Sequence, residues 1–293
     1  MKRFTGILPA LVTPLKADES INVPVLHRLI NSMIEEGANG FYVGGATGEG
    51  LALRTEERMI LAEESVKAAA GKAPCIVQVA ATDFNDMLLL AKQAEQCGAD
   101  AISATPPLFF GYDDGEVYEY YKRLANAVHI PVMIYYNPNA GFHVSAEFAA
   151  KCHKVDNITA IKWTCSNYDE MLRLKDLTQG DMNILNGPDQ MLLMGLNAGA
   201  DGGIGTTYNF MLDRYLAIYS AFCAGDIAAA QREQTETDRI IHAVCQYALI
   251  PATKAIMEAK GFDVGNATFP MKRYNAAEKA AMVKEFQAAG LQI

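Results

Sequence analysis

The segment Ile158-Thr159-Ala160-Ile161-Lys162-Trp163-Thr164 is short and apolar, and it carries a lysine near its end. A run of this kind is typical of a strand with both faces covered, as in a parallel sheet between helices. Burying an ammonium group is costly, so a lysine here must find a partner or become a neutral amine. A neutral amine is a nucleophile that can form a Schiff base with a carbonyl compound. The alternative is a lysine that leaves the strand into solvent, and the segment taken alone favours that alternative.

Similar apolar segments recur along the chain, and segments with helical spacing separate them. Strict alternation of this kind indicates βα units with a parallel sheet. Eight units in 293 residues predict an α/β fold, a closed (β/α)8 TIM barrel, rather than an open sheet. The predicted strands span residues 6–12, 40–43, 76–79, 101–104, 131–136, 158–164, 183–186 and 202–205.

A short turn motif precedes three of these strands. Residues 36–40, 97–101 and 198–202 each combine a glycine, a small residue and an Asn or Asp. The glycine suits the C-terminal cap of a helix, and the repetition suits a barrel of similar units.

The chain after residue 205 is predicted to be helical to its end, with helices near 214–223, 226–247, 250–260 and 276–289. Only the first of these is needed to complete a barrel. We therefore expect a barrel over residues 1–222 and a C-terminal helical extension over 223–293, packed on the barrel with a role in packing or assembly.

Composition narrows the classes of partner. Of the residues, 51% are hydrophobic, and the formal net charge of −9 argues against a nucleic-acid or anionic-membrane partner. The five histidines and six cysteines lack metal-ligand spacing, so we expect no metal. No signal-peptide pattern or apolar run of bilayer length is present, and we expect a cytoplasmic protein.

Polar residues collect where the predicted strands end, which is where barrel enzymes carry their sites. Strand alternation places Lys162 and Thr164 on one face, and it allows only one of Tyr135 and Tyr136 to point into the barrel. The glycine-rich loop 44–48 could expose backbone N–H groups to a carboxylate or phosphate, although a simple tight turn explains it about as well.

Several of these motifs together resemble the class I pyruvate aldolases typified by N-acetylneuraminate lyase and dihydrodipicolinate synthase, over essentially the whole chain. Residues 40–49 resemble the family's carboxylate loop, residues 135–138 its YNxP motif, and Ile161-Lys162 its Schiff-base strand. The segment 199–209, GADGGIGTTYN, is similar to the lyase rather than to the synthase branch.

The resemblance implies a role for each matching residue. Lys162 would be the nucleophile and Tyr135 the proton shuttle, because Tyr135 follows Pro131 at the family's spacing and shares a face with Met133. Ala46 and Thr47 would hold the substrate carboxylate. The sugar tail would lie against Thr164, Gly187, Asp189, Gln190 and Thr206.

Some positions depart from the family pattern. Ala46 stands where Ser or Thr is usual and Gln190 where the lyases usually have Glu. The loop 105–110 lacks the customary tyrosine, and the segment after Pro138 is one residue short.

The resemblance implies reversible cleavage of N-acetylneuraminate to N-acetylmannosamine and pyruvate, without metal or organic cofactor, by a homotetramer. The alternatives are another Schiff-base aldolase or dehydratase for a 2-keto acid, or a non-catalytic sugar-binding regulator. For Asp189, the alternative to sugar binding is that its side chain caps the short helix beginning near Met191.

Overall fold

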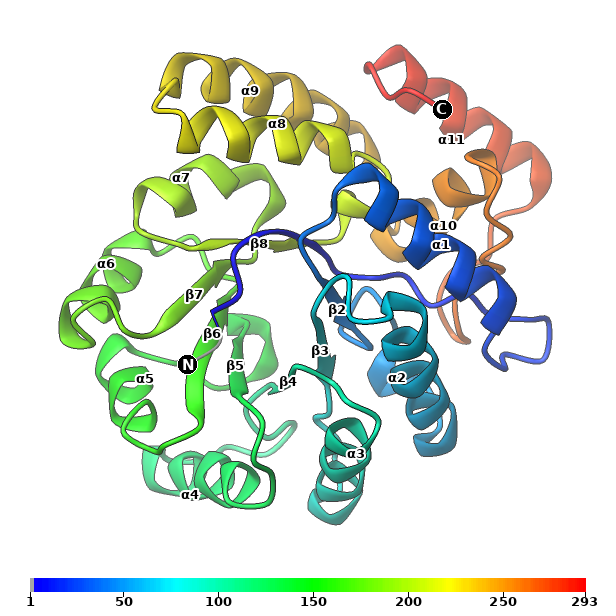
Figure 1. The fold of residues 1–293 in the computed structure, drawn as a ribbon. Helices are drawn as coiled ribbons and strands as arrows, with labels where there is room; N and C mark the ends of the chain where they lie inside the picture. Colours follow the sequence, from blue (N-terminus) through cyan, green and yellow to red (C-terminus); the bar gives the residue numbers. More distant parts are fainter. Residues whose placement is uncertain (1–2) are drawn as a thin grey trace.

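The computed structural model describes residues 3–293 and shows eight strands alternating with helices around a barrel (Figure 1). The predicted α/β barrel is confirmed. The strands are β1 (Gly6–Pro9), β2 (Phe41–Val43), β3 (Cys75–Gln78), β4 (Ala101–Ala104), β5 (Val132–Tyr136), β6 (Ile158–Trp163), β7 (Asn183–Asn186) and β8 (Gly202–Gly205). The helices that surround them are α1 (Val23–Glu36), α2 (Thr55–Ala69), α3 (Phe84–Gln96), α4 (Asp114–Ala125), α5 (Ala146–Cys152), α6 (Tyr168–Leu177), α7 (Leu192–Asn197) and α8 (Leu212–Cys223).

Every strand pairs in parallel with its neighbours, in the order β1-β8-β7-β6-β5-β4-β3-β2. The ring closes between β1 and β2 through one parallel bridge, Ala10 with Tyr42. The first strand ends at Pro9, earlier than the predicted residue 12. Beyond Pro9 the backbone also hydrogen-bonds to a side chain, since the Val12 N–H donates to Oδ1 of Asn209.

Period-two alternation divides the apolar residues into two clusters. One fills the barrel interior and includes Leu8, Tyr42, Met133, Tyr135 and Leu185. The other lies between the strands and the surrounding helices. The interior is therefore packed with side chains, and any site must lie at an end of the barrel.

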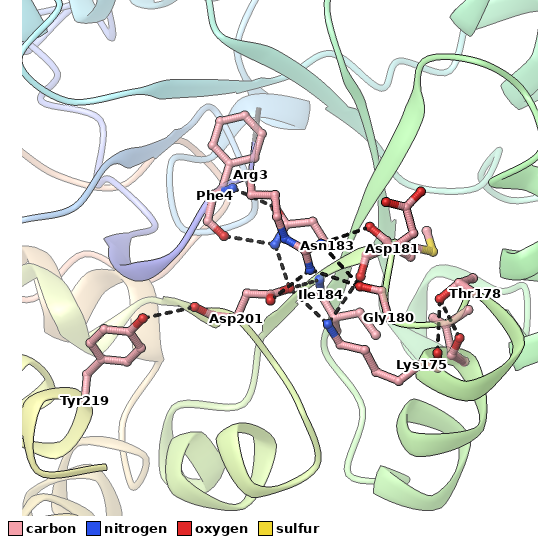
Figure 2. Close-up of polar contacts among 12 residues, drawn as sticks. Arg3, Phe4, Lys175, Thr178, Gly180, Asp181, Asn183, Ile184, Asp201 and Tyr219 are labelled. Atoms are coloured by element: carbon pink, nitrogen blue, oxygen red, sulfur yellow. Dashed lines mark hydrogen bonds and ion pairs between the residues drawn. The ribbon is translucent and has the colours of Figure 1, made fainter. Parts of the chain in front are cut away.

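The repeated turn motif lies at the N-terminal ends of the strands, where it sets the register between neighbouring strands. Asn39, Asp100 and Asp201 each accept a hydrogen bond from a backbone N–H of the strand before them, at 2.8 Å. Figure 2 shows the third of these turns, where Asp201 also contacts Arg3 and Lys175. The turns thus join adjacent strands, which explains why the motif recurs.

Short 3-10 turns follow four strands at their C-terminal ends. They are η1 (Gly50–Ala52), η2 (Pro138–Ala140), η3 (Asp189–Met191) and η4 (Thr207–Asn209). Three of these turns, η2, η3 and η4, carry polar side chains at this end of the barrel.

Three further helices complete the chain: α9 (Ile227–Val244), α10 (Leu249–Ala259) and α11 (Ala276–Ala288). Helix α9 lies along α8 (Figure 1). Helix α10 contacts η4 at the C-terminal end of the barrel. Within residues 3–293 no single helix meets the length and hydropathy expected of a membrane span, although α9 and α10, bent by 108°, do so as a pair.

Candidate active site

Lys162 is held inside the barrel near the C-terminal end of β6. Its register partner on β5 is Tyr135, so the two side chains lie on the same interior face. The side chain is 5% exposed, and its Nζ lies 4.4 Å from the ring centre of Tyr135 and 4.5 Å from that of Tyr42. The alternative of a solvent-facing lysine is therefore wrong. The amine rests on two aromatic faces, which attract a cation and tolerate a neutral amine.

The two adjacent tyrosines of β5 point to opposite sides. Tyr135 belongs to the interior cluster, with its ring edge-on to Tyr42 at 5.8 Å. Tyr136 belongs to the outer cluster, where its hydroxyl bonds His143 at 3.0 Å and its ring packs on Trp163. Burial, then the neighbouring Cys165, raises the pKa of Tyr136 to about 12. Of these two β5 tyrosines, only Tyr135 points into the barrel, where its ring contacts Lys162.

The glycine-rich loop after β2 is wound into a compact turn. A Cβ on Gly50 would lie 1.9 Å from the carbonyl oxygen of Gly44, so only glycine fits there. Among residues 3–293, no protein acceptor pairs with the N–H groups of Ala46 and Thr47. The Thr47 hydroxyl bonds that of Thr206 at 2.7 Å, which joins the loops after β2 and β8. The loop can therefore offer two N–H donors to an anion.

Among the cavities that residues 3–293 form, two at this end of the barrel share Asn137 and Asn139 in their linings. Lys162 itself is not among the residues that line them, and Tyr135 forms the boundary of the first. The first, of about 290 Å³, is lined by residues that include Ala46, Gln78, Thr105, Leu108, Tyr135 and Met271. The second, of about 420 Å³, is lined by residues that include Thr164, Gly187, Asp189, Gln190 and Thr206. The five residues predicted to meet a sugar tail thus share one cavity.

Asp189 is buried, and its carboxylate already has protein partners. Its Oδ2 accepts hydrogen bonds from the N–H and the hydroxyl of Thr207, both at 2.7 Å. Burial raises the pKa of Asp189, while the Thr207 bonds and the charge of Lys162 oppose that rise. Asp189 is the first residue of η3, and neither η3 nor α7 has a side-chain cap. The helix-capping alternative is wrong, because the carboxylate turns towards η4 instead.

Sequence reasoning missed several side chains around the amine. Tyr42 lies under Lys162 and donates a hydrogen bond to Ser103 at 3.0 Å, and burial raises its pKa well above that of a free phenol. Its place on the interior face could have been found from strand alternation. Met271 lines the first cavity although it lies in the C-terminal part of the chain, and no local sequence pattern predicts that contact.

The sequence matches the Dihydrodipicolinate synthetase family over residues 3–289.

The chain belongs to this family.

Within the Dihydrodipicolinate synthetase family, the chain is 33% identical over 282 residues to a protein from Rhizobium meliloti (strain 1021) named N-acetylneuraminate lyase. That match covers 96% of this chain and 93% of the relative. The solved structure of Proteus mirabilis N-acetylneuraminate lyase superposes with a TM-score of 0.94 at 29% identity, covering 99% of this chain and 100% of the other. The N-acetylneuraminate lyase (sialic acid aldolase) of Aliivibrio salmonicida gives 0.95 at 28% identity, covering 100% and 99%.

Proposed function

We propose that this chain is a carbon–carbon lyase that cleaves N-acetylneuraminate reversibly to N-acetylmannosamine and pyruvate through a Schiff base on Lys162. The observation that carries the proposal is a buried amine in register with Tyr135, which itself lines the first cavity. The names of the relatives support the same substrate.

The proposed reaction uses the side chains of the chain itself. The Lys162 amine attacks the C2 ketone, and water leaves to give an iminium. The Tyr135 oxygen takes the proton of the C4 hydroxyl while its own phenol proton passes to the substrate carboxylate. The C3–C4 bond breaks, and the bond electrons move into the iminium to form an enamine. N-acetylmannosamine leaves with C4 as its aldehyde. The proton then passes to C3 of the enamine, and hydrolysis releases pyruvate and the free amine.

Substrate positioning in this proposal divides between the two cavities. The N–H groups of Ala46 and Thr47 hold the carboxylate, as donors of a compact loop can do for an anion. Thr164, Gly187, Asp189, Gln190 and Thr206 face the sugar tail from the second cavity. The missing hydroxyl at Ala46 leaves backbone donation in place.

Reductive trapping tests the covalent step. Incubation with pyruvate and borohydride should attach a reduced adduct to Lys162, located by peptide mass spectrometry. Lys254 is an internal control, since it is 2% exposed but is ion-paired with Glu49 at 2.6 Å and should remain unmodified. Absence of the adduct, or full activity in Lys162→Ala, would falsify the mechanism.

A second candidate function is favoured by the walls of the first cavity. Leu51, Leu108 and Met271 give it an apolar lining next to Tyr135. Such a lining suits a 2-keto acid with a shorter or less hydroxylated tail, handled by an aldolase or dehydratase of the same Schiff-base type. Pyruvate release from a panel of 2-keto sugar acids separates the two, because the first proposal requires N-acetylneuraminate to give the highest kcat/KM.

The chain is further proposed to act in the cytoplasm as a homo-oligomer, a tetramer by family resemblance. Phe109 and Phe110, 92% and 67% exposed, offer an apolar surface on the loop after β4. Light scattering of the purified chain tests the assembly, and a monomeric mass would contradict it.

A further inference from the structure

A buried ion pair connects the carboxylate loop to the C-terminal helices. The Lys254 Nζ, on α10, lies 2.6 Å from Oε1 of Glu49, at the end of the loop after β2. The Lys254 side chain is 2% exposed and that of Glu49 is fully buried. The other carboxylate oxygen accepts the N–H of Thr268 at 2.6 Å, and Lys254 also donates to the Asn266 carbonyl at 2.9 Å.

On the loop side, Glu49 closes the turn that contains the two anion donors. Its φ of 58° is in the left-handed region, which a residue other than glycine adopts only when its surroundings hold it there. Its N–H donates to the Ala46 carbonyl at 3.1 Å, and its own carbonyl accepts from Ala52 at 2.8 Å. A displacement of Glu49 therefore moves the peptide groups of Ala46 and Thr47.

On the other side, the pair fixes a wall of the first cavity. The Thr268 N–H is held by Glu49, and the Thr268 carbonyl accepts from the N–H of Met271 at 2.9 Å. Met271 lines the cavity together with Ala46 and Tyr135. One carboxylate thus sets the relative position of the loop and of the wall that faces it.

We propose that Glu49 and Lys254 are positioning residues, which aim the Ala46 and Thr47 N–H groups at the substrate carboxylate. The inference rests on the proposed function, because it assigns a purpose to the same loop. A buried ion pair is weak support for stability, since well-packed apolar residues can replace it at little cost, so its use here favours a positional role. The C-terminal helices then form part of the site rather than only packing against the barrel.

The test measures how the rate of reductive trapping depends on pyruvate concentration. Lys254→Met should raise the half-saturating concentration by roughly 10- to 100-fold, the loss expected for a misplaced hydrogen bond to a charged group. The maximal trapping rate should stay within about threefold, because Lys162 and Tyr135 are not moved. An unchanged half-saturating concentration with a lower Tm would mean a purely structural role and would overturn the proposal.

Three further variants sharpen the result. Glu49→Gln/Lys254→Gln can restore a neutral hydrogen-bonded pair, so it should bind pyruvate better than Lys254→Met, and equal or weaker binding would contradict positioning. Lys254→Arg keeps the charge but displaces it, and serves if the Met variant does not fold. It too should raise the half-saturating concentration, and a wild-type value would overturn the proposal.

Arg273→Gln is the matched control, because Arg273 pairs with Glu19 at an exposed position and the wild-type value is expected there.

The two hypotheses fail in different ways. If wild-type protein gives no pyruvate adduct, the proposed function fails before the variants are compared. If wild-type protein is trapped and the variants keep its half-saturating concentration, only the positioning role fails.

Discussion

Tyr135 and Tyr136 show at the residue scale how strand geometry assigns different tasks to identical side chains. Tyr135 shares the barrel interior with Lys162, whereas the Tyr136 hydroxyl is engaged with His143 in the outer layer. A phenol next to the amine can exchange a proton with a substrate bound there. A phenol in the outer layer cannot reach that substrate.

We expect Tyr135→Phe to lose turnover by about 10²–10⁴-fold, the usual contribution of a general acid–base group. Borohydride should still trap pyruvate on Lys162, because the variant keeps the amine and the ring beneath it. Steady-state kinetics with N-acetylneuraminate and adduct mass spectrometry measure the two effects. Tyr136→Phe is the control, with near-normal turnover and a stability loss of about 1 kcal/mol from the His143 bond. The reverse pattern would move the proton shuttle to Tyr136.

At the scale of elements, the Asp189 carboxylate links η3 to η4 by hydrogen bonds to Thr207. The Thr207 hydroxyl that donates to Asp189 also bonds the Tyr215 hydroxyl at 2.5 Å, so the link extends to α8. The carboxylate therefore has a structural role, and its binding of a sugar hydroxyl remains a prediction. The two roles can be separated because the first affects the free energy of unfolding and the second affects kcat/KM.

Asp189→Ala should lower the free energy of unfolding by about 1–3 kcal/mol, since it leaves the buried Thr207 donors without an acceptor. It should also reduce kcat/KM for N-acetylneuraminate by about 1.5–3 kcal/mol if a charged hydrogen bond to the tail is lost. Pyruvate has no tail, so trapping on Lys162 should be near normal. Urea unfolding and kinetics on the same preparation measure all three quantities.

Gln190→Ala is the matched variant for this experiment. Gln190 lines the same cavity but is exposed, so its loss should change kinetics without changing stability. A destabilised Asp189→Ala with unchanged kinetics on N-acetylneuraminate would leave Asp189 as a structural link only.

The sequence predicts this site as far as local rules extend. Alternation along β5 allows only one of Tyr135 and Tyr136 into the barrel, and the family spacing after Pro131 selects Tyr135. The structure places Tyr135 in the barrel interior, in register with Lys162. Alternation does not reveal the acceptor of Thr207, because that depends on where two separate turns end. The same limit hides the Glu49–Lys254 pair, whose partners lie far apart in the chain and belong to no repeating pattern.

At the scale of the whole molecule, the two ends of the barrel have separate tasks. The C-terminal end holds Lys162 and the cavities, whereas the N-terminal end is closed by the polar network of Figure 2. There Asp201 contacts Arg3 at 3.0 Å and Lys175 at 3.2 Å, and accepts from Asn183 and the Ile184 N–H, each at 2.8 Å. These contacts bring together the chain before β1, helix α6, and the strands β7 and β8.

The network makes stability depend on pH. Burial alone would raise the pKa of Asp201, but the bonds from Asn183 and Ile184 and the charge of Lys175 outweigh it and lower the pKa below its usual value. In the window between that lowered value and the unfolded value of about 3.9, the unfolded chain binds more protons. The stability contributed by Asp201 is therefore complete above the window and is lost as pH falls through it.

We expect Asp201→Ala to cost about 2–3 kcal/mol at neutral pH and Asp201→Asn about 1 kcal/mol, since an amide can still accept the Ile184 N–H as Asn39 does for Ile7. Urea unfolding at a series of pH values should show the difference between wild type and Asp201→Asn shrinking as pH falls below about 4. Pyruvate trapping should be unchanged in folded protein, because the site lies at the other end of the barrel. A difference that stays constant down to acid pH would contradict the charge-based account, and lost trapping in folded protein would show that the two ends are coupled.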